Sequence, residues 1–180
     1  MSTITLPATG TWTIDPTHSA VSFSARHLMA AKVRGSFKSF SGSINITDTP
    51  ETSTVSVSID AASIDSGVED RDNHLRSADF LNVEDHSALT FVSTAVRPVA
   101  DGYEIDGTLT IRDTARPVTL HMEYSGVIAD PWGNEKAIFS ASTRINREDF
   151  GLTWNAPLEA GGWLVGKHVD IELEVQAVLA

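Results

Sequence analysis

The stretch Leu89-Thr-Phe-Val-Ser-Thr-Ala-Val-Arg-Pro-Val-Ala-Asp-Gly-Tyr-Glu-Ile-Asp-Gly-Thr-Leu-Thr-Ile111 decides the fold class of this chain. From Tyr103 to Ile111 every second residue is apolar or Gly, and the residues between them are acidic or Thr. This is the period of a β-strand with one buried face. Leu89 to Ala95 follows the same period, and Asp101-Gly102 can supply the positive φ of a tight turn. The stretch therefore predicts an antiparallel hairpin.

The two-residue period recurs through most of the chain. Between Val21 and His27, for example, the residues Val21, Phe23, Ala25 and His27 share one face. Further strands are predicted around Trp12–Ile14, Val33–Ile46, Val55–Ile59, Val118–Tyr124, Phe139–Ile145 and Val169–Val175. The total is about eight or nine strands, most of them joined by short turns, which favours a meander topology.

One segment, residues 67–82, interrupts this rhythm. It has no β-branched residue after Val68, and its acidic residues come early, where they suit the positive end of a helix dipole. We predict a short helix there, with Leu75, Ala78 and Phe80 as its apolar stripe. Such a helix can plug one end of a barrel.

An all-β domain with about eight strands must protect its sheet edges in a sandwich or remove them by closing into a barrel. We predict an eight-stranded antiparallel barrel with the short helix capping or flanking one end. Small residues such as Ala25 and Ala141 share faces with Phe23 and Phe139, which is compatible with an open lumen. A dry core, in which small and large side chains interdigitate, is the alternative.

The composition limits the classes of partner. Thirteen basic and 24 acidic side chains give a net charge of −11, which repels nucleic-acid phosphates and anionic membrane surfaces. With no cysteine, disulfides, thiolate chemistry and Cys-based metal sites are excluded. We therefore expect no nucleic-acid partner, no stable membrane insertion and no required cofactor.

The chain is expected to form one domain, with residues 1–11 as an N-terminal extension and residues 12–180 as the barrel. The first residues, Met1-Ser-Thr-Ile-Thr-Leu-Pro-Ala8, have neither a basic region nor an apolar run of signal-peptide length. Later segments also lack a run of 18 apolar residues. The expected location is the cytoplasm.

Several sequence blocks carry a resemblance to the YceI-like family, and it extends from Trp12 to Val178. The blocks are Trp12-Thr-Ile-Asp-Pro-Thr-His-Ser-Ala-Val-Ser-Phe23, Arg26-His27, Val33-Arg-Gly-Ser-Phe-Lys-Ser-Phe-Ser-Gly42, Asp70-Arg-Asp-Asn-His-Leu-Arg-Ser-Ala-Asp-Phe80, Thr90-Phe-Val-Ser93, Gly107-Thr-Leu-Thr-Ile111, Asn146-Arg-Glu-Asp-Phe-Gly151 and Val165-Gly166. The resemblance implies a lipocalin-like barrel, often a homodimer, that binds a polyisoprenoid such as an isoprenoid quinone or polyprenyl pyrophosphate. It implies no catalytic activity.

The chain departs from the family pattern in three ways. Many relatives carry a secretory signal that is missing here, a Pro expected near Ser87 is absent, and Asp113 stands where Gly is favoured. The missing signal puts a periplasmic location in doubt.

Ten residues are predicted to contact the lipid. They are Phe23, His27, Phe37, Phe40, Arg71, His74, Phe91, Phe139, Arg147 and Trp163. A neutral His27 could donate a hydrogen bond to a quinone carbonyl or a terminal hydroxyl, or it could be an ordinary core histidine. The aromatic residues could narrow the lumen or simply pack.

The two arginines and His74 leave two interpretations open. Arg71, His74 and Arg147 could present donors to a pyrophosphate. Alternatively, they could form a network with nearby aspartates that fixes the helix to the barrel rim. The carboxylates available for such a network are Asp70, Asp72, Asp79 and Asp149.

Catalytic and metal-binding motifs have little support in this sequence. The six histidines form neither a His-Glu-x-x-His motif nor a tight His-x-His pair, so no metal site is predicted. A nucleophile elbow and a phosphate loop are also missing. The predicted function is therefore storage or transport of an isoprenoid lipid. Two alternatives remain: a cofactor-free isomerase or cyclase acting on a similar substrate, and a filled barrel with an acidic docking face.

Overall fold

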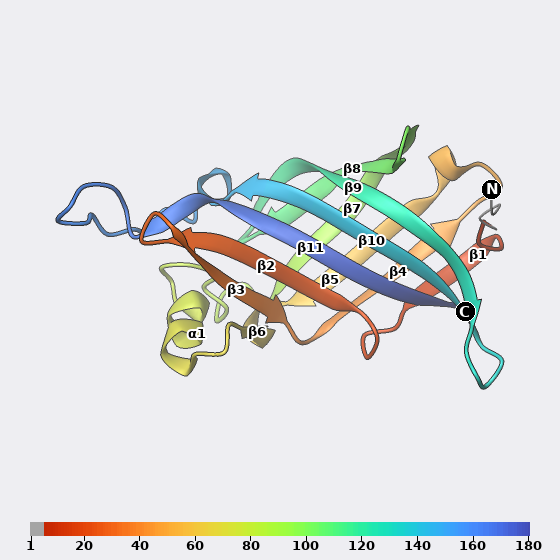
Figure 1. The fold of residues 1–180 in the computed structure, drawn as a ribbon, viewed down its shortest axis with the longest axis horizontal. Helices are drawn as coiled ribbons and strands as arrows, with labels where there is room; N and C mark the ends of the chain where they lie inside the picture. Colours follow the sequence, from red (N-terminus) through yellow and green to blue (C-terminus); the bar gives the residue numbers. More distant parts are fainter. Residues whose placement is uncertain (1–5) are drawn as a thin grey trace.

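The computed structural model describes residues 6–180 and shows a long β-barrel with one α-helix at one end (Figure 1). The strands are β1 (Gly10–Ile14), β2 (Ala20–His27), β3 (Ala31–Phe37), β4 (Phe40–Ile46), β5 (Thr54–Asp60), β6 (Ile64–Asp65), β7 (Ala88–Val99), β8 (Gly102–Ile111), β9 (Thr114–Ala129), β10 (Glu135–Asn146) and β11 (Val165–Leu179). The helices are α1 (Glu69–Arg76) and the 3-10 turns η1 (Pro50–Thr52), η2 (Ala61–Ser63) and η3 (Arg147–Phe150). Within the described residues, no helix has the length and apolarity needed to cross a membrane.

The barrel closes through the two ends of the chain. One edge of β11 pairs with β2 over most of its length and with β1 near the C-terminus, where Trp12 lies opposite Leu179. Three barrel strands are each divided into two segments, namely β1 with β2, β4 with β3, and β5 with β6. The eleven segments therefore form a closed, eight-stranded antiparallel barrel, and neighbours in the barrel follow one another in the chain. The predicted barrel and its meander order are confirmed.

The hairpin of β7 and β8 forms as predicted, but its turn lies one residue earlier than expected. Val99 pairs with Gly102, so the turn residues are Ala100 and Asp101. Gly102 opens β8 with a φ of 148°, and a Cβ atom there would lie 2.2 Å from the carbonyl oxygen of Met122 in β9. The glycine is therefore required by the close approach of a neighbouring strand as well as by its backbone angle.

A β-bulge in β7 changes which residues face inward. The pairing with β8 shifts between Ser93 and Ala95, and beyond the shift Val96 is buried while Ala95 is exposed. The sequence pattern placed Ala95 on the inner face. An extra residue reverses the alternation beyond a bulge, so the period of the sequence could not reveal this change.

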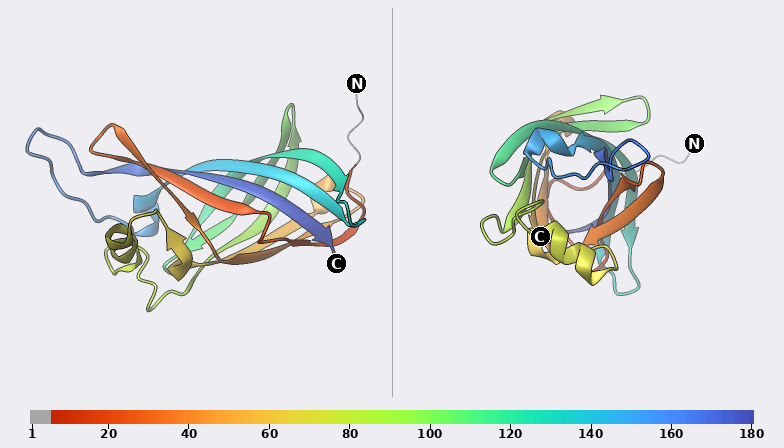
Figure 2. Two further views of the ribbon diagram at one scale, coloured as in Figure 1. Left: turned by 60° about the horizontal axis from the view of Figure 1, so that its bottom comes forward. Right: turned by 90° about the vertical axis from the view of Figure 1, so that its left-hand side faces the viewer.

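The predicted helix exists but is shorter than its predicted segment, because it ends at Arg76. Of the predicted stripe, Leu75 packs against the core and Phe80 is buried, but Ala78 is exposed and both Ala78 and Phe80 follow the helix. The Arg76 guanidinium donates to the carbonyl oxygens of Ala62 and Ile64, both at 2.9 Å. These bonds hold α1 beside the barrel rim, where the end-on view in Figure 2 shows it.

The predicted N-terminal extension is only partly outside the barrel. Residues 1–5 lie outside the described residues. β1 begins at Gly10, within the predicted extension, and the Trp12 indole donates to the carbonyl oxygen of Ala8 at 2.8 Å. This bond ties the segment before β1 to the most deeply buried large side chain of the described residues.

Candidate functional site

A cavity of about 460 Å³ occupies the interior of the barrel. This size is within the range of pockets that bind small molecules. Leu75, Phe80 and Leu152 line it at the end that carries α1, which we call the α1 end. Leu6 and Pro50 line it at the opposite end, which we call the terminal end because the C-terminus lies there (Figure 1). The cavity therefore extends along the barrel.

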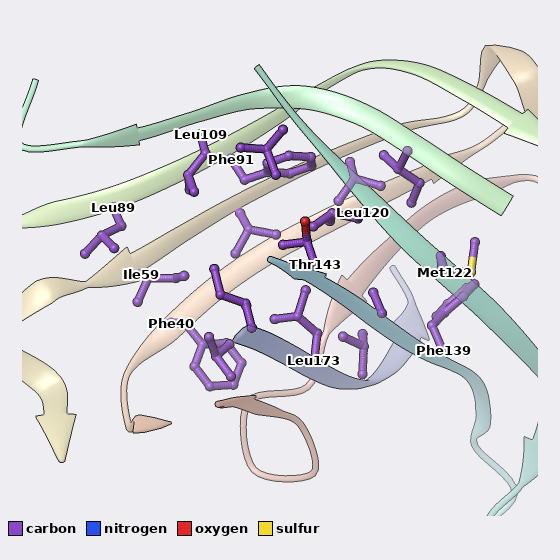
Figure 3. A pocket seen from close by; sticks show the side chains of 18 of the residues that line it. Phe40, Ile59, Leu89, Phe91, Leu109, Leu120, Met122, Phe139, Thr143 and Leu173 are labelled. Carbon is purple, nitrogen blue, oxygen red and sulfur yellow. The ribbon is translucent and has the colours of Figure 1, made fainter. Parts of the chain in front are cut away.

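The middle of the cavity is lined by aliphatic and aromatic side chains. Figure 3 shows them pointing inward from strands on all sides of the barrel. They include Phe40, Ile59, Leu89, Phe91, Leu109, Leu120, Met122, Phe139 and Leu173. Many of these positions belong to the buried core, so the inner faces of the strands serve as both core and cavity wall.

Two glycines allow large rings to lie against the barrel wall. Phe23 in β2 lies directly opposite Gly35 in β3, and a Cβ atom at Gly35 would be 2.5 Å from its Cζ atom. In the same way, a Cβ atom at Gly107 would be 2.3 Å from Cζ of Phe91. Each ring therefore covers the backbone of the neighbouring strand. A ring in this position takes less room from the lumen than one that points across it.

Arg147 is the basic residue among those that line the cavity, and it is 3% exposed. Its guanidinium donates to four carbonyl oxygens at 2.7–3.3 Å. The acceptors belong to Leu152, Trp154, Val165 and Gly166. Burial lowers the pKa of Arg147, and the nearby Glu148 charge opposes this effect. An arginine nevertheless remains charged at neutral pH, so the α1 end of the cavity contains a fixed cation.

Other polar groups on the wall include Thr47, Asp48 and Ser53 near Pro50 at the terminal end. Thr143 donates a hydrogen bond to the carbonyl oxygen of Thr119 at 2.9 Å, which satisfies its hydroxyl. Tyr124 packs against Phe139 with ring centroids 5.2 Å apart. Burial, followed by the nearby Tyr103, raises the pKa of Tyr124, so its hydroxyl stays protonated at neutral pH. Among residues 6–180, no histidine lines the cavity.

Six of the ten predicted lipid-contact residues line the cavity. They are Phe23, Phe37, Phe40, Phe91, Phe139 and Arg147. The structure brings these side chains from five strands and η3 to one lumen. The other four, His27, Arg71, His74 and Trp163, are not among the lining residues. His27 ends β2 opposite Ala31, and Trp163 is 53% exposed on the loop before β11.

Arg71 and His74 contact other parts of the α1 end. Arg71 donates to the hydroxyl and carbonyl oxygens of Ser66 at 2.7 and 2.9 Å. His74 lies 2.9 Å from Asp79, and its ring packs edge-on against Phe80 and Trp154. Phe80 lines the cavity and His74 packs against its ring.

The predicted arginine–aspartate network takes a different form. Asp72, which is 6% exposed, accepts hydrogen bonds from the backbone N–H and the hydroxyl of Ser66. Ser66 therefore connects Asp72 to Arg71, whereas Arg147 bonds to backbone carbonyls. The physical reason is geometric, since carbonyls of the loop after η3 and of the start of β11 surround the guanidinium of Arg147 and accept its hydrogen bonds without a carboxylate.

Sequence reasoning missed two groups of residues. The first group contains the aliphatic residues that line the cavity, together with Leu6, Pro7 and Tyr124. These residues are recognised as cavity lining only because the structure shows that they face the lumen. The second is on the outer surface, where one ligand atom each of Asp101, His121 and Glu123 lie within 4.8 Å of one another. Asp101 joins this group from a neighbouring turn, so no spacing motif could indicate it.

Comparisons with known proteins agree with this architecture. A family model described as the YceI-like domain matches residues 12–177. A UPF0312 protein of Staphylococcus epidermidis is 38% identical over 168 residues, which cover 90% of this chain and 94% of that protein. Protein YceI of Salmonella newport is 39% identical over 137 residues, which cover 76% of this chain and 72% of that protein.

Two groups of solved structures share the fold. The Campylobacter jejuni YCEI protein is 28% identical with a TM-score of 0.74, and the match covers 86% of this chain and 90% of that one. A Saccharophagus degradans polyisoprenoid binding domain, implicated in plant cell wall breakdown, is 14% identical with a TM-score of 0.65, covering 94% and 98%. The matched family model and the identity to curated relatives together show that this chain belongs to the YceI-like family.

Proposed function

We propose that this protein binds one long isoprenoid lipid, an isoprenoid quinone or a polyprenyl pyrophosphate, inside its barrel and stores or carries it. The observation that carries the proposal is the apolar cavity of about 460 Å³ that extends along the barrel axis. Each buried methylene contributes about 0.8 kcal/mol, so a polyprenyl chain reaches micromolar or tighter affinity from burial alone. The name of the Saccharophagus degradans domain, which shares the fold, supports this ligand class.

Arg147 supports an amphiphilic ligand with its polar group at the α1 end. Four carbonyl oxygens accept from its guanidinium, but a guanidinium has five N–H donors. It is also a cation in a wall that is mostly aliphatic and aromatic, and the acidic residue of that wall, Asp48, lies near Pro50 at the terminal end. A carbonyl or phosphate oxygen of the lipid would be attracted to this charge more strongly than in water, because the surroundings have a low dielectric constant.

Binding without catalysis fits the wall better than a cofactor-free isomerase or cyclase does. A proton-transfer enzyme needs a titratable group near the reacting atom, with a pKa suited to the working pH. His27 was the sequence candidate for that role, and it is not among the residues that line the cavity. The pKa of Tyr124 is raised by burial, away from neutral pH, so this hydroxyl is a poor base. The proposed role requires no cofactor.

The test is to identify what the purified protein holds. Native mass spectrometry gives the stoichiometry, and solvent extraction followed by mass spectrometry identifies the lipid. Ala141→Phe adds a ring inside the lumen, and Ser142→Phe on the same strand adds it to the outer face. We expect the lipid to be lost from A141F and kept by S142F. If wild-type protein stays empty after incubation with quinones and polyprenyl phosphates, the proposal is wrong.

A further inference from the structure

Two loops at the α1 end meet in an exposed apolar projection. One is the turn between β2 and β3, and the other is the connection between η3 and β11; Figure 1 shows both extending beyond the barrel at the same end. The backbone N–H of Leu28 donates to the carbonyl oxygen of Leu164 at 2.8 Å. The backbone N–H of Trp163 donates to Sδ of Met29 at 3.5 Å. We call Leu28, Met29 and Trp163 together the apolar tip.

Burial does not account for the apolar side chains of the tip. Leu28, Met29 and Trp163 are 53%, 63% and 53% exposed, respectively. Leu28 and Met29 also have φ angles of 52° and 68°. Tight turns with positive φ favour Asn and Gly, whereas Leu and Met are strained there. Two large apolar residues are thus held in a costly conformation and exposed to water, which indicates a surface selected for contact.

The charges behind the apolar tip are basic, although the chain is acidic overall. Residues 16–47 contain Arg26, Lys32, Arg34 and Lys38 and no acidic residue. Arg26 donates to the carbonyl oxygen of Ala30 at 2.8 Å, so its charge stays next to the turn. The nearby Asp170 is already paired with Arg144 at 2.7 Å. Glu159 is the acidic residue of the second loop between Gly151 and Leu164, and it is exposed. Exposed Glu69, Asp70 and Asp79, in and after α1, add negative charge at the same end of the barrel.

The terminal end also has an exposed aromatic residue, but the charged residues nearest to it in the sequence are mainly acidic. Trp132, between β9 and β10, is 84% exposed. Its loop, residues 130–134, contains Asp130 and no basic residue, and β10 begins with Glu135 and then Lys136. Trp132 therefore provides a natural control for the effect of exposure alone.

We propose that the apolar tip docks on the surface of a lipid bilayer that contains anionic lipids. Trp163, Leu28 and Met29 enter the boundary between headgroups and acyl chains, where exposed Trp and aliphatic side chains are stabilised. Arg26 and Lys32 then lie near the lipid phosphates, and each adds an attraction that salt screens. The net charge of −11 opposes contact elsewhere on the surface, so docking is reversible and selects one orientation.

Docking in this orientation places the α1 end of the cavity, with Arg147, toward the membrane. If the protein carries an isoprenoid as proposed above, this is the end through which the lipid is exchanged. The docking surface itself does not depend on that function. Vesicle binding and lipid content can therefore be measured separately, and the two proposals can fail independently.

The experiment is flotation of the full-length protein with vesicles of phosphatidylcholine alone or mixed with phosphatidylglycerol. The variant Leu28→Asn/Met29→Gly puts favoured residues at both positive-φ positions, so we expect its Tm to stay equal or rise. Its partition into mixed vesicles should fall by about tenfold or more. Trp163→Ala should weaken binding in the same direction, and Trp132→Ala should leave it unchanged. High salt should reduce wild-type binding.

Three results would overturn the proposal. The first is wild-type protein that does not float with either vesicle composition. The second is equal flotation of the wild type and the L28N/M29G variant. The third is a wild-type dimer that the same variant converts to monomers while vesicle binding is absent, since the apolar tip would then be an interface between two copies. A tryptophan emission shift that W163A abolishes and W132A keeps would support docking directly.

Discussion

Gly35→Ala tests how the barrel keeps its lumen open. A Cβ atom at Gly35 would lie 2.5 Å from Cζ and 3.0 Å from Cε1 of Phe23, and 3.0 Å from the carbonyl oxygen of Asp65. Phe37 packs against the same ring, with centroids 5.7 Å apart, and restricts its movement along the wall. The ring must therefore turn into the lumen. Overpacking of this kind costs about 1–3 kcal/mol, which lowers the Tm of a chain of this length by about 2–12 °C.

The assay is a double-mutant cycle of G35A, Phe23→Leu and the combined variant, followed by thermal unfolding. Leucine lacks the Cζ and Cε1 atoms that the new methyl group would meet, so the double variant should recover stability. We expect a coupling energy of about 1–2 kcal/mol. G35A should also hold less lipid than wild type, and G35A/F23L should regain it. If the stability changes of G35A and F23L add in the double variant to within about 0.5 kcal/mol, the Phe23 ring does not depend on the missing side chain at Gly35, and the reasoning is refuted.

Three further predictions concern the polar groups that support the barrel ends. Arg147→Lys keeps the positive charge, but a lysine ammonium cannot donate to all four carbonyl oxygens. Urea unfolding should therefore show a free energy of unfolding about 3–5 kcal/mol below that of the wild type, and an unchanged free energy would contradict the prediction. Hydrogen bonds, first from Thr17, hold the pKa of Asp15 far below its ordinary value, so its stabilisation is present above about pH 4 and is lost as the pH falls further. Asp15→Asn should lower the Tm at pH 7 by about 2–4 °C and should make the Tm fall less steeply than in the wild type as the pH is lowered below about 4. Parallel Tm–pH curves for the two proteins would show that Asp15 does not contribute this stabilisation. Asp72→Ala removes the acceptor for Ser66 and should speed amide exchange in α1 relative to β10.

The amino-acid sequence determined the class of fold and the order of its strands. The alternation from Tyr103 to Ile111 and the short connections between strands were sufficient for a meander, and closure follows because open edges are unfavourable. The sequence also identified inward aromatic residues such as Phe23 and Phe91. Both lie on strands with a regular period, where a local pattern gives the direction of a side chain.

Tertiary structure decided what the local pattern could not contain. The bulge at Ser93 reversed the inner face and brought Val96 inward, and the carbonyl acceptors of Arg147 came from a loop and from β11. Whether the lumen is open depends on distances between strands that are far apart in the chain, such as the one between the Phe23 ring and Gly35. A sequence specifies direction along one strand, but a cavity is a property of all eight strands together, because its volume is what their side chains leave unfilled.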